Sequence, residues 1–190
     1  MSKLFQYAGI AASVVLIAFG IGAAVIGLNG RDRVSTELAR EQIVGTPDSS
    51  IPGQLVNTGS EAQAFAKTIR KHTLESTGGL TYSKMDRFLD ENGKPTSDES
   101  KAAINPASGK PVENGLRNLW VTSTALTTAL NTAYFAESMA TFVMVMGFAL
   151  LLTGIGFLVL TLRLLGAPSA TKQAVERAPS PAPKPAVGAA

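Results

Sequence analysis

The longest apolar pattern in the chain runs from Leu116 to Leu165 and predicts one continuous helix, since no proline interrupts it. Its second half, from Met139 onward, has no charge before Arg163 and is long enough to cross a bilayer. At helical rise, roughly fifty residues span about 75 Å, whereas the hydrocarbon core takes only about 30 Å. The helix is therefore predicted to extend beyond one membrane face as a stalk.

A repeat of seven residues runs along this predicted helix. Small or apolar residues alternate at spacings of three and four, which is the heptad geometry of paired helices. In the membrane half the repeated residues are small, and small residues let two helix backbones approach closely in lipid. Their general abundance in transmembrane helices is the alternative explanation. The predicted packing residues of this helix are Ala133, Ala140, Gly147, Gly154 and Thr161.

A second apolar stretch, from Ala8 to Leu28, contains no charge and only one polar residue, Ser13. Its length fits a transmembrane helix. The alternative is a cleaved signal peptide with Gly22 in its small-residue site, but the apolar run continues past that site, so an uncleaved span is favoured.

Small residues in this first span also repeat at seven, at Ser13, Gly20 and Gly27. The simplest inference is that the two spans pack antiparallel through these faces, and packing against a second copy is the alternative. The expected fold is an all-α membrane protein, an antiparallel transmembrane helix hairpin extended into a stalk with a small helical extracytoplasmic cap.

The segment between the spans predicts two short helices and no strand. Ser60 is the expected N-cap of the first, with Gln63 completing a capping box, and Gly78-Gly79 ends it. The second is expected at Tyr82–Leu89, followed by a long, weakly anchored polar loop over 92–115. The predicted organisation is a span at 1–28, an extracytoplasmic segment at 29–115, the long helix at 116–165, and a disordered Ala/Pro-rich tail at 166–190.

Charge predicts the orientation and one contact. The net charge of +3 comes from the chain ends. Basic residues beside membrane spans are typical of the cytoplasmic side, so they are not interpreted as a nucleic-acid-binding surface. Both termini are therefore expected in the cytoplasm, with 29–138 outside a plasma membrane. Glu137, at the predicted membrane edge, is expected to pair with Arg31 or Arg33.

Candidate chemistry is sparse. The chain has no cysteine and one histidine, His72, so neither a thiolate nor a histidine-pair metal site can form within one chain. His72 is expected to face solvent, Trp120 to be a packing anchor, and Asp86 and Asp90 to form a solvated face rather than a cation site. No cofactor, metal or small-molecule substrate is predicted, and an enzyme is not expected.

Three runs resemble a family of small actinobacterial two-span membrane proteins without an assigned function: EQIVGTPD at Glu41–Asp48, TGGLTY at Thr77–Tyr82, and RNLWVTSTALTTAL at Arg117–Leu130. Some members carry an automatic label as an aromatic ring-opening dioxygenase subunit. That chemistry needs non-haem iron, held by two histidines and a carboxylate, which one histidine per chain does not supply. The resemblance implies two spans and a cell-envelope location.

The favoured function is a structural or accessory subunit of a cell-envelope membrane assembly. Its expected partners are the lipid bilayer and either another membrane protein or a second copy of the chain. An extracytoplasmic sensor or adaptor that relays to the cytoplasmic tail is one alternative, and a homo-oligomeric scaffold or pore is another. Ionisable residues inside the spans would indicate transport, and the two apolar stretches have none before Arg163.

Overall fold

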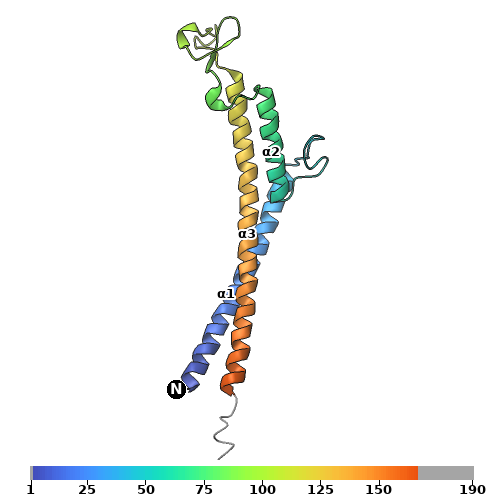
Figure 1. Ribbon diagram of the computed structural model, residues 1–190, viewed down its shortest axis with the longest axis vertical. Coiled ribbons are helices and arrows are strands. Elements are labelled where there is room, and N and C mark those ends of the chain that lie inside the picture. The colour runs from blue at the N-terminus through green and yellow to red at the C-terminus, as the bar shows by residue number, and fades with distance from the viewer. Residues whose placement is uncertain (1, 167–190) are drawn as a thin grey trace, which may run out of the picture. The chain divides into compact units, whose positions relative to one another are not determined.

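The computed structural model describes residues 2–166, and the predicted Ala/Pro-rich tail lies outside them except for Gly166. Its helices are α1 (Ser2–Arg40), α2 (Gly59–Ser76) and α3 (Gly115–Gly166). The two long apolar helices, α1 and α3, pack against each other, and α2 is the small third helix (Figure 1). The prediction of a mostly helical chain built on two long apolar helices is therefore confirmed.

The chain divides into two compact units. Of the described residues, the first unit holds 2–21 and 147–166, and the second holds Gly22–Met146. In both units α1 and α3 run antiparallel, because rising residue numbers on α1 meet falling numbers on α3. Gly9 faces Thr161 and Gly20 faces Leu151 in the first unit, whereas Gly27 faces Met144 in the second.

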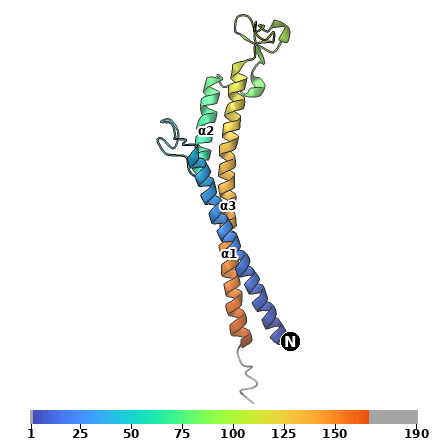
Figure 2. The same cartoon turned by 180° about the vertical axis from the view of Figure 1, so that it is seen from behind.

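In the second unit α2 lies beside α3, as the two opposite views show (Figures 1 and 2). The apolar face of α2 closes a small core together with the end of α1, the loop after it, and α3. The buried residues of this core are Leu38, Val56, Ala62, Ala66 and Leu130.

The start of α2 differs from the prediction. The N-cap is Thr58, and the capping box is completed by Glu61 rather than by Ser60 and Gln63. Glu61 Oε2 accepts the backbone N–H groups of Asn57 at 3.0 Å and of Thr58 at 2.9 Å. A carboxylate makes stronger hydrogen bonds than a side-chain amide, which favours the earlier box. At the other end, the positive φ of Gly78 (62°) and Gly79 (80°) carries the chain out of α2 as expected.

The expected second helix at Tyr82–Leu89 does not form. Only a 3-10 turn, η1 (Tyr82–Lys84), precedes the short antiparallel strands β1 (Phe88–Leu89) and β2 (Pro95–Thr96). A turn between Asp90 and Lys94 joins the strands. Asp90 Oδ1 accepts the backbone N–H groups of Asn92 at 2.9 Å and of Lys94 at 2.8 Å, and Gly93 has a φ of 73°. These turn bonds fix β1 against β2, and a helix through Leu89 would prevent that pairing.

The expectation of a weakly anchored loop at 92–115 is also wrong. A second 3-10 turn, η2 (Glu99–Lys101), follows β2, and the chain then returns to β1. Leu89 N–H donates to Val112 O at 3.0 Å, and Ala103 N–H donates to Leu89 O at 2.8 Å. These backbone bonds hold the segment against residues 87–89 before α3 begins.

Candidate functional site

In the first unit the predicted packing residues bring the two helix backbones into contact. A Cβ added at Gly20 would lie 2.5 Å from the Leu151 nitrogen and 2.8 Å from the Gly147 oxygen. A Cβ at Gly154 would lie 3.0 Å from the Ile17 nitrogen. A Cβ at Gly20 would therefore force the two backbones apart, whereas a Cβ at Gly154 would also require the Ile17 side chain, whose Cγ1 would lie 2.8 Å away, to shift.

Ser13 and Thr161 lie in the same contact. Ser13 is fully buried, and its hydroxyl donates to the Gly9 carbonyl oxygen one turn earlier at 2.8 Å. Thr161 packs on Gly9, where an added Cβ would lie 2.7 Å from the threonine hydroxyl oxygen. Gly9 is a packing residue that the seven-residue repeat missed. It precedes Ser13 by four residues, so continuing the alternation of three and four on α1 identifies it.

In the second unit the predicted packing residues are Gly27, Ala140 and Ala133. A Cβ at Gly27 would lie 2.6 Å from the Ala140 oxygen and from the Met144 nitrogen. Ala133 is half-buried against the core that contains Leu38.

Glu137 joins all three helices of the second unit, and we call this arrangement the Glu137 junction. Arg31 Nη2 on α1 donates to Glu137 Oε1 at 3.3 Å. Glu137 Oε2 accepts the backbone N–H of Gly59, the first residue of α2. The first N–H groups of a helix have no partner inside the helix, and a carboxylate there also complements the helix dipole. Glu137 therefore fixes the start of α2 on α3 and ties α1 to both.

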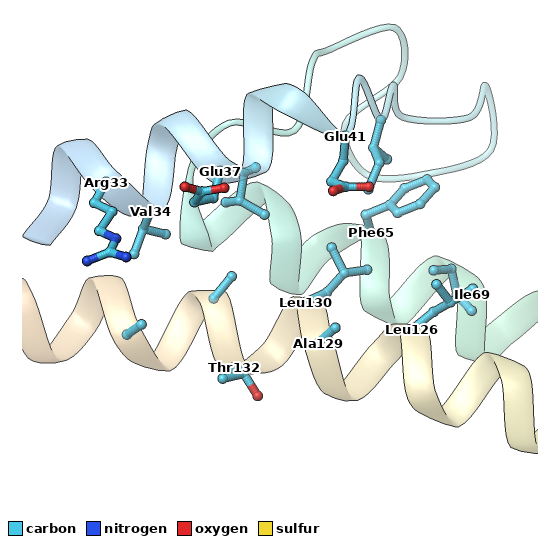
Figure 3. Close-up of a pocket in the computed structure, with 14 residues that line it drawn as sticks. Arg33, Val34, Glu37, Glu41, Phe65, Ile69, Leu126, Ala129, Leu130 and Thr132 are labelled. Atoms are coloured by element: carbon cyan, nitrogen blue, oxygen red, sulfur yellow. The ribbon is translucent and has the colours of Figure 1, made fainter.

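Of the two arginines expected to pair with Glu137, the structure brings Arg31 there and not Arg33. Arg33 lines a groove between the end of α1, α2 and α3. The groove has a volume of about 750 Å³ and lies entirely within the second unit. Figure 3 shows Arg33 and Val34 at one end of it, and Phe65, Ile69 and Leu126 towards the other.

The groove is mostly apolar, with charges along the α1 side. Its larger apolar lining residues are Val34, Leu38, Phe65, Ile69, Leu126 and Leu130. Glu37 and Glu41 also lie on it, and both oxygens of Glu37 accept from Arg40 Nη1 at 3.0 Å. Among residues 2–166, neither Arg33 nor Glu41 belongs to an ion pair. The sequence pattern did not identify this groove, because its lining residues come from separate segments of the chain.

His72 has a specific partner rather than solvent alone. Its Nε2 lies 2.7 Å from Asp48 Oδ2, and Lys71 Nζ lies 2.9 Å from the same oxygen. Hydrogen bonds from the Lys71 ammonium, from His72 and from the Thr46 hydroxyl hold the pKa of Asp48 well below its usual range. The pKa of Lys71 is raised in turn by the Asp48 carboxylate. This cluster attaches the loop after α1 to α2, and His72 remains half-exposed.

The other candidate residues have structural contacts. Trp120 lies beneath the Arg70 guanidinium at 5.6 Å from the ring centroid, which places it against α2. Asp86 Oδ1 accepts from the Ser97 hydroxyl at 2.6 Å, and Asp90 holds the β1–β2 turn. Within residues 2–166, no three His, Asp or Glu side chains are grouped so as to hold a metal ion.

No family model, characterised protein or solved structure matches this chain. The resemblance to the actinobacterial two-span family therefore stays a prediction. The architecture that the described residues define is a pair of long apolar helices, each long and apolar enough to cross a membrane, with a small third helix.

Proposed function

We propose that this protein is a non-enzymatic integral membrane protein that serves as a structural or accessory subunit of a cell-envelope assembly. The observation that carries the proposal is the backbone-level contact at Gly20 and Gly154, made by helices whose outer faces carry large exposed apolar side chains. Such contacts stabilise helix pairs in lipid, where the hydrophobic effect does not drive helices together. The outer faces are then free to contact lipid or a neighbouring helix.

The proposed placement puts α1 and α3 across a plasma membrane, with both termini in the cytoplasm and 29–138 outside. The basic chain ends support this orientation. Glu137 and Arg31 then lie at the outer membrane edge, where their ion pair borders on water. The resemblance stated above supports an actinobacterial cell envelope.

The ionisable side chains of the second unit support a structural function more than a catalytic one. Glu137, Asp48 and Asp86 accept hydrogen bonds that hold one segment to another, and Asp90 accepts hydrogen bonds within its own turn. A catalytic acid or base must be able to bond a substrate, and these four carboxylates already have partners.

The test is a purification of the tagged native protein in mild detergent, followed by native mass and partner identification. A stable heteromeric complex supports the accessory-subunit proposal, and the partner identifies the process. A defined homo-oligomer favours a scaffold or pore, and a clean monomer contradicts the proposal. Gly147→Leu and Gly154→Leu should disrupt the helix pair, whereas Gly22→Leu is the matched control, because a Cβ at Gly22 meets nothing within 4 Å.

The groove favours a second candidate, an extracytoplasmic adaptor that responds to a ligand. Its volume of about 750 Å³ and its mostly apolar lining are typical of a small-molecule site. A ligand-dependent change in hydrogen exchange of the segments that line the groove would support this candidate. If each ligand that binds leaves the exchange of these segments unchanged, the candidate is excluded.

A further inference from the structure

We propose that the groove of the second unit binds one single-chain anionic amphiphile, such as a fatty acid. Its acidic group would lie at Arg33 and its acyl chain would run towards Leu126. This inference rests on the proposed membrane placement. It adds to the proposed function a ligand class, a binding site and a binding direction.

The dimensions of the groove fit one acyl chain. Its volume of about 750 Å³ lies inside the usual range for small-molecule sites. Its α3 wall extends from Leu126 to Ala136, which is about 15 Å at helical rise. One leaflet of a bilayer holds acyl chains over half of the hydrocarbon thickness, which is also about 15 Å. By contrast, a partner helix would contact only about three turns of α3 here.

The exposure of the groove indicates that it has room for an apolar occupant. Leu126 is 52% exposed, although it faces a wall of apolar side chains from α2. Leu38 and Leu130, at 7% and 6% exposure, form the buried base beneath it. An acyl chain in the groove would remove the exposed apolar surface from water, which is favourable in proportion to the area covered.

Charge sets the direction of the amphiphile. Arg33 lies at the end of the groove nearer the proposed membrane edge, and it has no carboxylate partner among the described residues. A guanidinium binds carboxylate or phosphate in a forked geometry. Glu37 and Glu41 lie farther along the groove from Arg33 and would repel an anionic group there (Figure 3). An anionic head is therefore held next to the membrane surface, and the chain points away from it.

The chain's single tryptophan provides the measurement. Trp120 lies six residues before Leu126, about 9 Å along α3. It also lies about 25 Å from Glu137 and the proposed membrane edge, so a spin label that stays in the bilayer does not reach it. We would place the full chain in phosphatidylcholine vesicles and add stearate carrying a nitroxide either near its methyl end or near its carboxylate. The expected result is saturable quenching of Trp120 that is stronger with the methyl-end label.

Matched variants test the two contacts. Arg33→Gln should weaken apparent binding about tenfold, which is the effect of one charge-assisted hydrogen bond, and Arg33→Lys should keep most of it. Leu126→Gln should weaken binding several-fold, and Leu126→Met should bind as the unaltered chain does. Circular dichroism of each variant checks that the helices remain. A spin-labelled alkyl trimethylammonium of the same length should bind more weakly than stearate.

Several results would overturn the inference. The first is the absence of saturable Trp120 quenching with either label. The second is quenching in Arg33→Gln equal to that in the unaltered chain. The third is tighter binding of the cationic amphiphile than of stearate. A dimer that Leu126→Gln dissociates would instead make the groove an interface between copies of the chain. Failure of the protein to insert into vesicles would refute the membrane placement itself, whereas a native monomer that still shows saturable quenching would refute only the accessory-subunit proposal.

Discussion

Replacement of Glu137 tests whether one carboxylate organises the three helices of the second unit. Its side chain is 18% exposed, and it accepts from Arg31 on α1 and from the first N–H of α2 at Gly59. We expect Glu137→Ala to loosen the start of α2 first, because the Gly59 N–H has no intrahelical partner to replace the carboxylate.

The magnitude follows from these two contacts. A hydrogen bond to a charged group contributes about 1.5–3 kcal/mol. The Arg31 partner is 42% exposed, so its ion pair adds no more than about 1 kcal/mol. Glu137→Ala should therefore destabilise the junction by about 2–4 kcal/mol. Glu137→Gln keeps a neutral acceptor for Gly59 and should cost about 1–2 kcal/mol.

The assay is hydrogen–deuterium exchange of the peptide that covers the first turns of α2. A loss of about 2 kcal/mol corresponds to an exchange rate about thirtyfold faster, so Glu137→Ala should exceed that and Glu137→Gln should fall between fivefold and thirtyfold. The matched control is Glu37→Gln, which breaks an ion pair with Arg40 whose side chains are 57% and 67% exposed and should change exchange little.

Unchanged exchange at α2 in Glu137→Ala would show that this carboxylate does not hold the start of α2. Equal effects of the alanine and glutamine variants would show that the charge, rather than an acceptor for Gly59, sets the stability. Equal effects of the Glu37 and Glu137 variants would show that the response is a general consequence of removing a negative charge.

Two further changes have defined outcomes. Gly20→Leu should separate α1 from α3 in the first unit, because its Cβ would lie 2.5 Å from a backbone nitrogen of α3, whereas a Cβ at Gly22 meets nothing within 4 Å. Thermal unfolding in detergent should therefore show a lower melting temperature for Gly20→Leu than for Gly22→Leu. Equal melting temperatures would contradict the close contact. The Asp48 attachment to Lys71 and His72 should be complete above pH about 4 and lost as the pH falls further, because the folded pKa lies below the unfolded value. Exchange of the loop after α1 should rise on acidification in the natural chain, and a similar rise in Asp48→Asn would show that another group is responsible.

The two long helices and the face through which they pack were predictable from local properties of the chain. Apolar content, length and the spacing of small residues are local properties, and they place Gly20, Gly154 and Thr161 on the helix face where the structure places them. The end of α2 was also predictable, because paired glycines leave a helix at positive φ.

Local pattern was insufficient where two patterns compete within a few residues. Thr58 with Glu61 and Ser60 with Gln63 both fit a capping box, and the tertiary contact of Gly59 with Glu137 agrees with the first. The segment after α2 has helix-compatible residues up to Leu89, but the bonds of Asp90 to its own turn and the return of the chain to β1 make it a hairpin instead.

The Glu137 junction, the Asp48 cluster and the groove depend on long-range contacts. Each brings together segments far apart in the sequence, such as Gly59 and Glu137, which are separated by 78 positions. Periodicity describes which face of one helix is apolar, but it carries no information about which residue of another segment that face meets. The choice between Arg31 and Arg33 as the partner of Glu137 has the same cause, since the rotation of α1 against α3 directs one to the junction and the other to the groove.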